Sequence, residues 1–410
     1  MTVYNFKVNH EGRSSMATPE PTPAPDPTPA PNPTPRGALV DIGDIPMPDQ
    51  RVEPDITDAM DYPTAFRFAF IGVGQGGSRL TESFRDLGYR RACVLNTTEK
   101  DLAHINLPSP NKLVLPTLAV AGGQGAGKDP RVAELAAQDK GEEIYDLLRR
   151  CWGDRYDWSF VCFGLGGGTG AGASTKVIET ARKIMGDLRL PQHVGAIVAL
   201  PKADEGARVA ANAISTIHRL QGLNLSPVII VDNERIREIY PRTPVGQFWG
   251  VANRSVTTLL HLFNRIAAIP SPHTSFDPAD LASIMASGVV AFGATPVTRH
   301  ETQADISKAI RQQLKGNVLA SLDLTRGRIA GCIFIGGEDL LNNLPQDYLD
   351  HGFDMLTRLL APGSTVHRGI YPGARADLSA YTMIGGLDWP GERLTELQSH
   401  GQPDTGPRPQ

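Results

Sequence analysis

The chain has 410 residues, 40% of them hydrophobic, which is enough for two domains or for one large domain with extensions. Its net charge of −4 and pI of about 6.2 provide no overall basic surface for nucleic acid. The N-terminal region lacks an apolar leader, and no apolar run approaches the roughly 18 residues of a membrane span. We therefore expect a soluble, cytoplasmic protein that neither binds nucleic acid directly nor inserts into a membrane.

The four cysteines are scattered along the chain, and no pair has the spacing of metal ligands. Three of them lie in or beside apolar runs that resemble strands, which favours buried, reduced thiols. We expect no metal site built from protein ligands. The cysteines are Cys93, Cys151, Cys162 and Cys332.

Residues 1–65 are predicted to be disordered. Every second residue from Pro19 to Pro35 is proline, a pattern that favours polyproline II and excludes helix and sheet. Such an arm is either a solvated tail or spacer, or a ligand for an unknown proline-binding partner.

Ordered structure is expected to begin with a strand over 66–71, followed by the glycine-rich loop 72–77 and a helix over 78–87. A second strand over 92–95 leads into Asn96 and Thr97, and a short third strand covers 112–115. The loop 122–127 then precedes an amphipathic helix over 130–150, with Asp129 as its N-cap and Pro130 at its first position.

The stretch 164–172 follows an apolar strand over 158–163 and precedes a predicted helix over 174–184. Six of its nine residues are glycine, which exceeds what a tight turn needs and carries an entropic cost. A glycine turn before a helix presents bare N–H groups and the positive end of the helix dipole. The stretch therefore predicts a phosphate-binding loop, with Thr169 as its only polar side chain.

Two more β-branched runs over 193–199 and 227–231 complete an alternation of strands and helices. This alternation predicts a Rossmann-like parallel α/β sheet covered on both faces, with three glycine-rich loops at the carboxyl ends of its strands. Apolar residues at helical spacing predict a long central helix over 245–267, ended by Pro270 and Pro272.

A second α/β region follows, with helices near 304–314 and 347–360 and strands near 329–335, 365–370 and 380–384. The predicted division is a disordered arm (1–65), a nucleotide-binding domain (66–243), a central helix (244–269), a C-terminal domain (270–389) and a disordered tail (390–410).

Two common nucleotide-binding motifs fit only in part. Gly72 to Gly77 matches the dinucleotide fingerprint, but Asn96 stands where that fold needs an acid for the ribose. Gly122 to Lys128 lacks only the Ser or Thr of a Walker A motif, and Asp129 replaces the hydroxyl that would bind Mg²⁺. Neither motif explains why the chain carries several glycine loops.

Taken together, the loops resemble those of the tubulin/FtsZ superfamily, in that family's order and over residues 66–388. Gly166 to Gly172 resembles its signature, and 200–206 resembles the sugar-binding segment, particularly of the CetZ branch. The resemblance implies a GTPase that binds GTP or GDP, with Mg²⁺ as a further cofactor. The nucleotide-binding residues it implies are Gly74, Gln75, Gly76, Gly77, Asn96, Gly125, Ala126, Gly127, Gly167, Gly168, Thr169, Gly170, Glu205, Asn233, Trp249 and Asn253.

The resemblance also implies that catalytic acids come from a neighbouring subunit, on the loop after the central helix. Here these are Asp277 and Asp280, three residues apart around Pro278. Without that role, the same pair would be a plain helix cap. A site divided between two faces implies head-to-tail self-assembly, and unlike surfaces in contact produce an open filament.

Several residues depart from the FtsZ pattern. Arg254 follows Asn253 where an acid is common, Ser275 replaces an Asn before the first catalytic acid, and Val209 stands in place of an Arg. Residues 367–372 resemble CetZ, and the tail lacks an apolar peptide for membrane tethers. These departures favour a cell-shape, plasmid-partition or viral filament over a division ring. The alternatives are a GTP-binding filament or adaptor protein without turnover, or a Rossmann NAD-binding protein.

Overall fold

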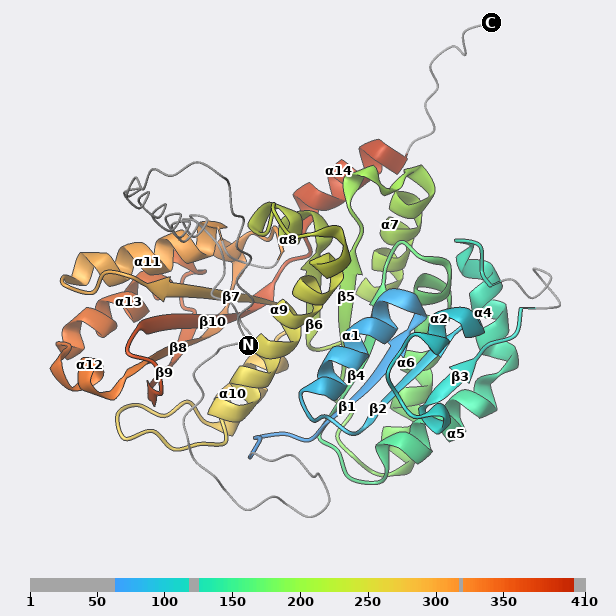
Figure 1. Ribbon diagram of the computed structural model, residues 1–410, viewed down its shortest axis with the longest axis horizontal. Helices are drawn as coiled ribbons and strands as arrows, with labels where there is room; N and C mark the ends of the chain where they lie inside the picture. The colour runs from blue at the N-terminus through green and yellow to red at the C-terminus, as the bar shows by residue number, and fades with distance from the viewer. Residues whose placement is uncertain (1–62, 118–124, 317–319, 402–410) are drawn as a thin grey trace, which may run out of the picture. The chain divides into compact units, whose positions relative to one another are not determined.

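The computed structural model describes residues 63–117, 125–316 and 320–401, which all belong to one compact unit. They form a ten-stranded sheet in the order β3-β2-β1-β4-β5-β6-β7-β10-β8-β9 (Figure 1). The strands are β1 (Phe68–Val73), β2 (Ala92–Asn96), β3 (Lys112–Val114), β4 (Trp158–Gly164), β5 (Val194–Leu200), β6 (Val228–Asp232), β7 (Val289–Val297), β8 (Ile329–Gly337), β9 (Thr365–Gly373) and β10 (Leu378–Leu387). All pairs are parallel except those of β10, which is antiparallel to both β7 and β8.

Helices connect most of the parallel strands, as right-handed crossovers require. They are α1 (Gly74–Asp86), α2 (Glu99–Ala103), α4 (Pro130–Asp139), α5 (Gly141–Trp152), α6 (Gly168–Asp187), α7 (Ala207–Gln221), α8 (Asn233–Ile239), α9 (Val245–Ile266), α10 (Pro278–Met285), α11 (Gln303–Gly316), α12 (Glu338–Asn343), α13 (Gln346–Leu359) and α14 (Gly391–Gly401). Short 3₁₀ turns lie at Ser109–Asn111, Ala203–Glu205 and Leu324–Arg326.

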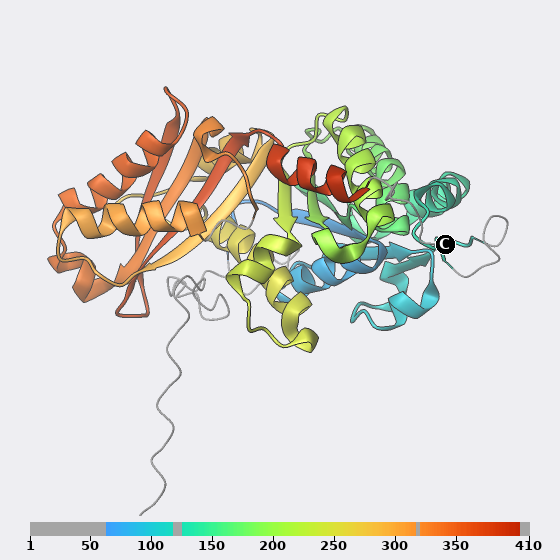
Figure 2. The same cartoon turned by 90° about the horizontal axis from the view of Figure 1, so that it is seen from above.

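The sheet has a hydrophobic core on each face. Alternation along β1 sends Ala69 and Ile71 to one core and Phe68 and Phe70 to the other. Residues of α4–α7, α11 and α13 contribute to the first core, and residues of α1, α8, α9 and α10 to the second (Figure 2). The α/β fold with helices on both faces is therefore confirmed.

The central helix is also confirmed, since α9 covers Val245–Ile266. It follows β6 in the chain and lies between the strands β1–β6 and β7–β10 (Figure 1). The sheet is not interrupted there, because β6 and β7 pair directly. The predicted boundaries at 243 and 269 thus fall in the connections before and after α9, within a continuous sheet.

Both helices that follow the glycine-rich stretches begin earlier than predicted. Helix α1 starts at Gly74 rather than 78, and α6 at Gly168 rather than 174. Close packing explains both cases, since a Cβ on Gly77 would lie 1.9 Å from the carbonyl oxygen of Cys162. A Cβ on Gly170 would lie 2.6 Å from the carbonyl oxygen of Gly164. The low helix propensity of glycine is thus overridden by packing.

Three other expectations differ from the structure. The single helix predicted over 130–150 is two helices, because Lys140 between them leaves helical geometry with ψ at 28°. Strand β7 was not predicted, since Gly293 and Pro296 weaken its pattern. Helix α7 was not predicted either; half of its six buried residues are alanine or threonine, so its apolar stripe is weak.

The tail predicted to be disordered over 390–410 contains helix α14. Arg393, Leu394 and Leu397 lie at helical spacing, with Arg393 and Leu397 buried, and the helix packs against α7. This apolar stripe is too short to stand out in a polar sequence. The proline-rich segment, by contrast, lies outside the described residues. No helix in the described ranges is long and apolar enough to cross a membrane.

Candidate nucleotide site

Two helix N-termini meet where the strand order reverses. Strands β1 and β4 are adjacent and parallel, yet the chain continues from them in opposite directions across the sheet. Helix α1 starts directly after β1, and α6 starts four residues after β4. Their first turns both line one cavity of about 470 Å³. Such a switch point, with two positive helix ends, is suited to a polyanion.

The glycines of these turns serve two purposes. Gly77 and Gly170 allow close packing, as their distances to Cys162 and Gly164 show. Gly76 and Gly167 differ, because a Cβ there would have no atom within 4 Å. Both of these glycines line the cavity. The backbone at Gly76 and Gly167 is therefore open to a ligand.

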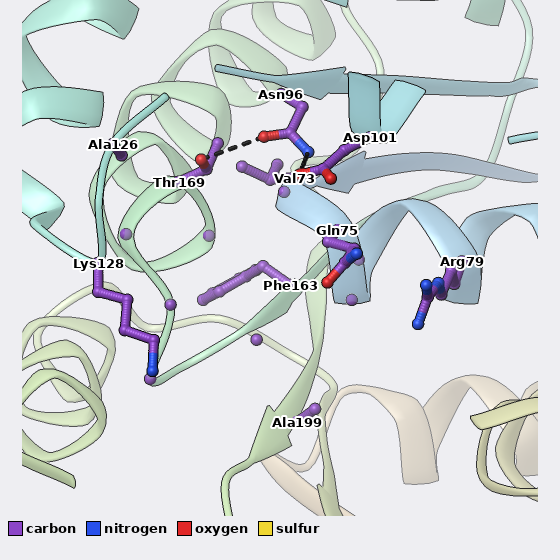
Figure 3. A pocket seen from close by; sticks show the side chains of 18 of the residues that line it. Val73, Gln75, Arg79, Asn96, Asp101, Ala126, Lys128, Phe163, Thr169 and Ala199 are labelled. Carbon is purple, nitrogen blue, oxygen red and sulfur yellow. Dashed lines mark hydrogen bonds between the residues drawn. The ribbon is translucent and has the colours of Figure 1, made fainter. Parts of the chain in front are cut away.

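A hydrogen-bond network fixes the floor of the cavity (Figure 3). The Thr169 hydroxyl lies 2.7 Å from Oγ1 of Thr97 and donates to Oδ1 of Asn96 at 3.2 Å. The same Oδ1 accepts the Thr97 N–H at 2.7 Å, while Nδ2 donates to Asp101 at 3.0 Å. The Thr169 hydroxyl, predicted to line the phosphate loop, is thus bonded to Asn96, which joins the end of β2 to the first turn of α6 and to α2.

The third glycine-rich loop covers the cavity from the α4 side. Gly125 and Gly127 have φ of 85° and 54°, and Lys128 follows with φ of 60°. Asp129 caps α4 by accepting the Arg131 N–H at 3.0 Å, as predicted. The loop contacts α6 closely, since a Cβ on Gly168 would lie 2.8 Å from Cβ of Ala126. Residues 118–124, which include Gly122, are outside the described residues.

The opposite end of the cavity is formed by β5, β6 and α9. Glu205 lies in the 3₁₀ turn after β5, where its carboxylate accepts the Lys202 N–H at 2.9 Å. Asn233 is the first residue of α8 and is buried. Trp249 and Asn253 lie one turn apart on α9, and Trp249 is 40% exposed despite its size. An exposed indole beside an amide suits a flat heteroaromatic ring.

All sixteen residues predicted to bind nucleotide line this cavity. The sequence interpretation did not include several others that line it, among them Arg79, Thr97, Thr98, Asp101 and Lys128. Figure 3 shows the side chains of Arg79 and Lys128 on different sides of the cavity. Lys128 belongs to the third glycine-rich loop but was not among the residues predicted to bind nucleotide. Arg79 lies on the second turn of α1, where its position one turn after Gln75 could have indicated it.

Asp277 and Asp280 do not line the cavity, but they do cap α10 as predicted. The Asp277 carboxylate accepts the Asp280 N–H at 2.9 Å, and the Asp280 carboxylate accepts the Asp277 N–H at 3.1 Å. Asp280 also lies 2.6 Å from Nδ1 of His367 on β9. The loop is held from beneath by Tyr371, whose hydroxyl accepts the Phe276 N–H at 2.8 Å. Burial raises the pKa of Tyr371 to about 12.

In the described ranges, no group of three or more His, Cys, Asp or Glu residues is placed to hold a metal ion. The described cysteines are all free thiols, and burial raises the pKa of Cys162 and of Cys332 to about 12.

Comparisons with known proteins identify the family of the chain. Residues 67–241 match the family model described as "Tubulin/FtsZ family, GTPase domain", and residues 158–325 match a model described as "Tubulin like". Cell division protein FtsZ 1 of Archaeoglobus fulgidus is 32% identical over 276 residues, which cover 66% of this chain and 69% of that protein. The tubulin-like protein CetZ of Pyrococcus horikoshii is 25% identical, covering 78% of this chain and 86% of that protein.

The fold has close structural counterparts as well. The GTPγS-form protofilament of TubZ from Bacillus thuringiensis serovar israelensis superposes with a TM-score of 0.70. The match covers 83% of this chain and 92% of that chain at 18% identity.

Proposed function

The chain belongs to the tubulin/FtsZ family of GTPases, and we propose that it binds GTP in this cavity and assembles head to tail into filaments. The proposal rests on one observation above all. Residues from three glycine-rich loops, two strand ends and the central helix converge on one cavity, while the two predicted acids lie elsewhere. A nucleotide in this cavity would contact backbone amides but no Asp277 or Asp280.

The cavity fits GTP in its two halves. The open backbone at Gly76 and Gly167 and the helix N-termini suit the phosphates. In this proposal Glu205 binds the sugar hydroxyls, Asn233 and Asn253 bind the edge of guanine, and Trp249 stacks on its face. Among the carboxylates near the phosphate half is Asp101, which is hydrogen-bonded to Asn96. Mg²⁺ would be held mainly by phosphate oxygens and water, as is usual for this ion, and it would neutralise the developing charge.

Hydrolysis would then need a second subunit. Asp277 is exposed and Asp280 is half-buried, so this face is accessible to a neighbour's nucleotide. A carboxylate placed near the γ-phosphate can orient and partly deprotonate the attacking water. Contact between the acid-bearing face and the cavity face joins unlike surfaces, which extends to an open filament. A cytoplasmic location remains a prediction, as does a partner for the proline-rich arm.

Phosphate release measured against protein concentration tests the proposal. We expect no release below a critical concentration and a linear rise above it, with filaments sedimenting over the same range. A protein that binds GTP and sediments without releasing phosphate would instead be the filament or adaptor without turnover. Release that scales with concentration from zero would place both acids and nucleotide in one subunit, against the proposal.

A further inference from the structure

Helix α14 brings a buried cation behind the sugar and base half of the cavity. Arg393 is 4% exposed, and its guanidinium lies 3.2 Å from the Asp232 carboxylate, which is 1% exposed. Its Nη2 donates to the carbonyl oxygen of Pro201 at 2.6 Å, and its Nη1 donates to Glu396 at 2.6 Å. Five N–H groups in a rigid plane allow one side chain to hold three partners.

Two of these partners are strand ends that carry nucleotide-site residues. Asp232 is the last residue of β6 and caps α8 by accepting the Glu234 N–H at 3.0 Å. Asn233 follows it directly and faces the cavity. Pro201 follows β5, lines the cavity itself, and precedes the 3₁₀ turn that carries Glu205. Arg393 therefore joins the backbone that holds Glu205 to the backbone that holds Asn233.

The pairing between these strands ends where Arg393 binds. Leu200 and Asp232 are the last partners in the register of β5 and β6. Beyond them the two chains separate, one into the 3₁₀ turn and the other into α8. No ladder hydrogen bond fixes their spacing from that point, so side chains supply the cross-links. One is the Arg393 guanidinium, and another is the Glu234 carboxylate, which accepts the Ala203 N–H at 3.3 Å.

Removing the guanidinium would leave a buried acid without its cation. Burial raises the pKa of the Asp232 carboxyl, and Arg393 opposes this rise. Glu396, the third partner of Arg393, is itself an acid and cannot replace the cation beside Asp232. Loss of the guanidinium would therefore disturb the backbone at Pro201 and at Asp232 together.

We propose that Arg393 is a positioning residue for the sugar and base half of the nucleotide site, so that docking of α14 against α7 is required for tight guanine-nucleotide binding. This inference rests on the proposed function of the cavity. Arg393 does not line the cavity and acts through Pro201 and Asp232. Among the hydrogen bonds and ion pairs of the described residues, those of Arg393 go to Asp232, Pro201 and Glu396, and none goes to the phosphate half, which is formed by the first turns of α1 and α6 and the loop at 125–128.

Because Arg393 acts on only one half of the cavity, a positioning role can be distinguished from a general effect on stability. Calorimetric titration of the full chain with GTP and, separately, with inorganic triphosphate compares the two halves of the cavity. For Arg393→Met we expect the Kd for GTP to rise about tenfold or more, and the Kd for triphosphate to change less than about twofold. Arg393→Lys keeps the charge but lacks the rigid planar fork of the guanidinium, so its Kd for GTP should lie between those of the parent and Arg393→Met.

Arg326→Met is the matched control, because Arg326 is 66% exposed and pairs with Asp323 and Asp388 away from the cavity. It should bind both ligands as the parent does. The inference is overturned if folded Arg393→Met binds GTP as the parent does, or loses affinity for both ligands equally. Should Arg393→Met fail to fold, parent-like GTP binding by Arg393→Lys overturns it. A parent that binds triphosphate but not GTP would overturn the proposed function itself.

Discussion

The Asp280 carboxylate lies 2.6 Å from Nδ1 of His367, and the other ring nitrogen of His367 lies 3.4 Å from the Ser283 hydroxyl. Asp280 and Ser283 are one turn apart on α10, while His367 comes from β9, 87 positions further along the chain than Asp280. The proposed catalytic acid is therefore held from two sides, by the Asp277 N–H within its own helix cap and by an imidazole from the sheet.

Asp280→Ala is expected to bind GTP and assemble like the parent while hydrolysing GTP about 100-fold more slowly, because water near the γ-phosphate loses its carboxylate. Phosphate release and sedimentation of the same samples check this. Hydrolysis at the parent rate would refute the assignment. A mixture of Asp280→Ala with a variant that cannot bind nucleotide should recover activity, because each supplies the half that the other lacks.

His367→Ala tests the imidazole separately from the acid. It leaves Asp280 and the α10 cap in place but removes the contact that orients the carboxylate. We expect kcat to fall several-fold, with the critical concentration for assembly unchanged. His351→Ala is a suitable control, since His351 is exposed on α13 and its Nδ1 contacts only the Asp347 carbonyl among the hydrogen bonds of the described residues. Equal kcat in the two variants would show that His367 has no part in orienting Asp280.

The glycine loops illustrate what the sequence could and could not reveal. Their number, spacing and order predict a parallel α/β fold with a phosphate site, because a phosphate cradle needs bare backbone after a strand. The sixteen predicted residues that line the cavity followed from the resemblance to the tubulin/FtsZ superfamily. The role of each individual glycine could not be predicted from the sequence. Nothing in the sequence separates Gly76, which faces open space, from Gly77, which packs on β4, since that difference depends on residues 85 positions away.

Contacts between distant segments explain the other misses. Helix α14 carries a short apolar stripe, and its stability comes from α7 and from the pairing of Arg393 with Asp232, 161 positions earlier. His367 likewise belongs to a strand whose pattern gives no sign of the acid it contacts. Local periodicity predicts elements, but side chains that join elements become visible only when the sheet is assembled.

Gly76→Ala and Gly77→Ala form a matched pair of neighbouring substitutions. A methyl group on Gly77 would collide with the Cys162 carbonyl at 1.9 Å, so we expect a loss of about 3 kcal/mol or more in the free energy of unfolding. On Gly76 it meets no protein atom, and stability should hold or rise by about 0.5–1 kcal/mol. Affinity for GTP should nevertheless fall, because the methyl group enters the cradle. Denaturant titration measures the change in stability, and a binding assay measures the affinity for GTP. Parent-like affinity in Gly76→Ala would exclude this turn as a phosphate contact.

Trp249→Ala is expected to weaken GTP binding with little effect on folding. The indole is 40% exposed and lines the cavity, and stacking of a base on an aromatic ring is worth about 1–3 kcal/mol. Trp249→Phe should keep part of this stacking energy and therefore part of the affinity for GTP. The neighbouring Phe248, which packs against the core, serves as the contrast: Phe248→Ala should lower stability instead. Inorganic triphosphate should bind the Trp249 variants and the parent alike. If it did not, the ring would be acting on the phosphate half.

The pH dependence of stability should reveal His261 on the central helix. Burial, assisted by Arg265, lowers the pKa of His261 from 6.5 to about 3, and its Nδ1 lies 3.1 Å from the Tyr89 hydroxyl. His261 is therefore protonated below about pH 6.5 in the unfolded chain, but only below about pH 3 in the folded chain. Stability from the neutral ring is fully present above pH 6.5 and declines as the pH falls, by about 1 kcal/mol per pH unit. Denaturant titrations of the parent and of His261→Gln between pH 7 and 5 measure the difference. We expect the parent to lose more stability than the variant over this range, and parallel curves would show that His261 is protonated in the folded protein.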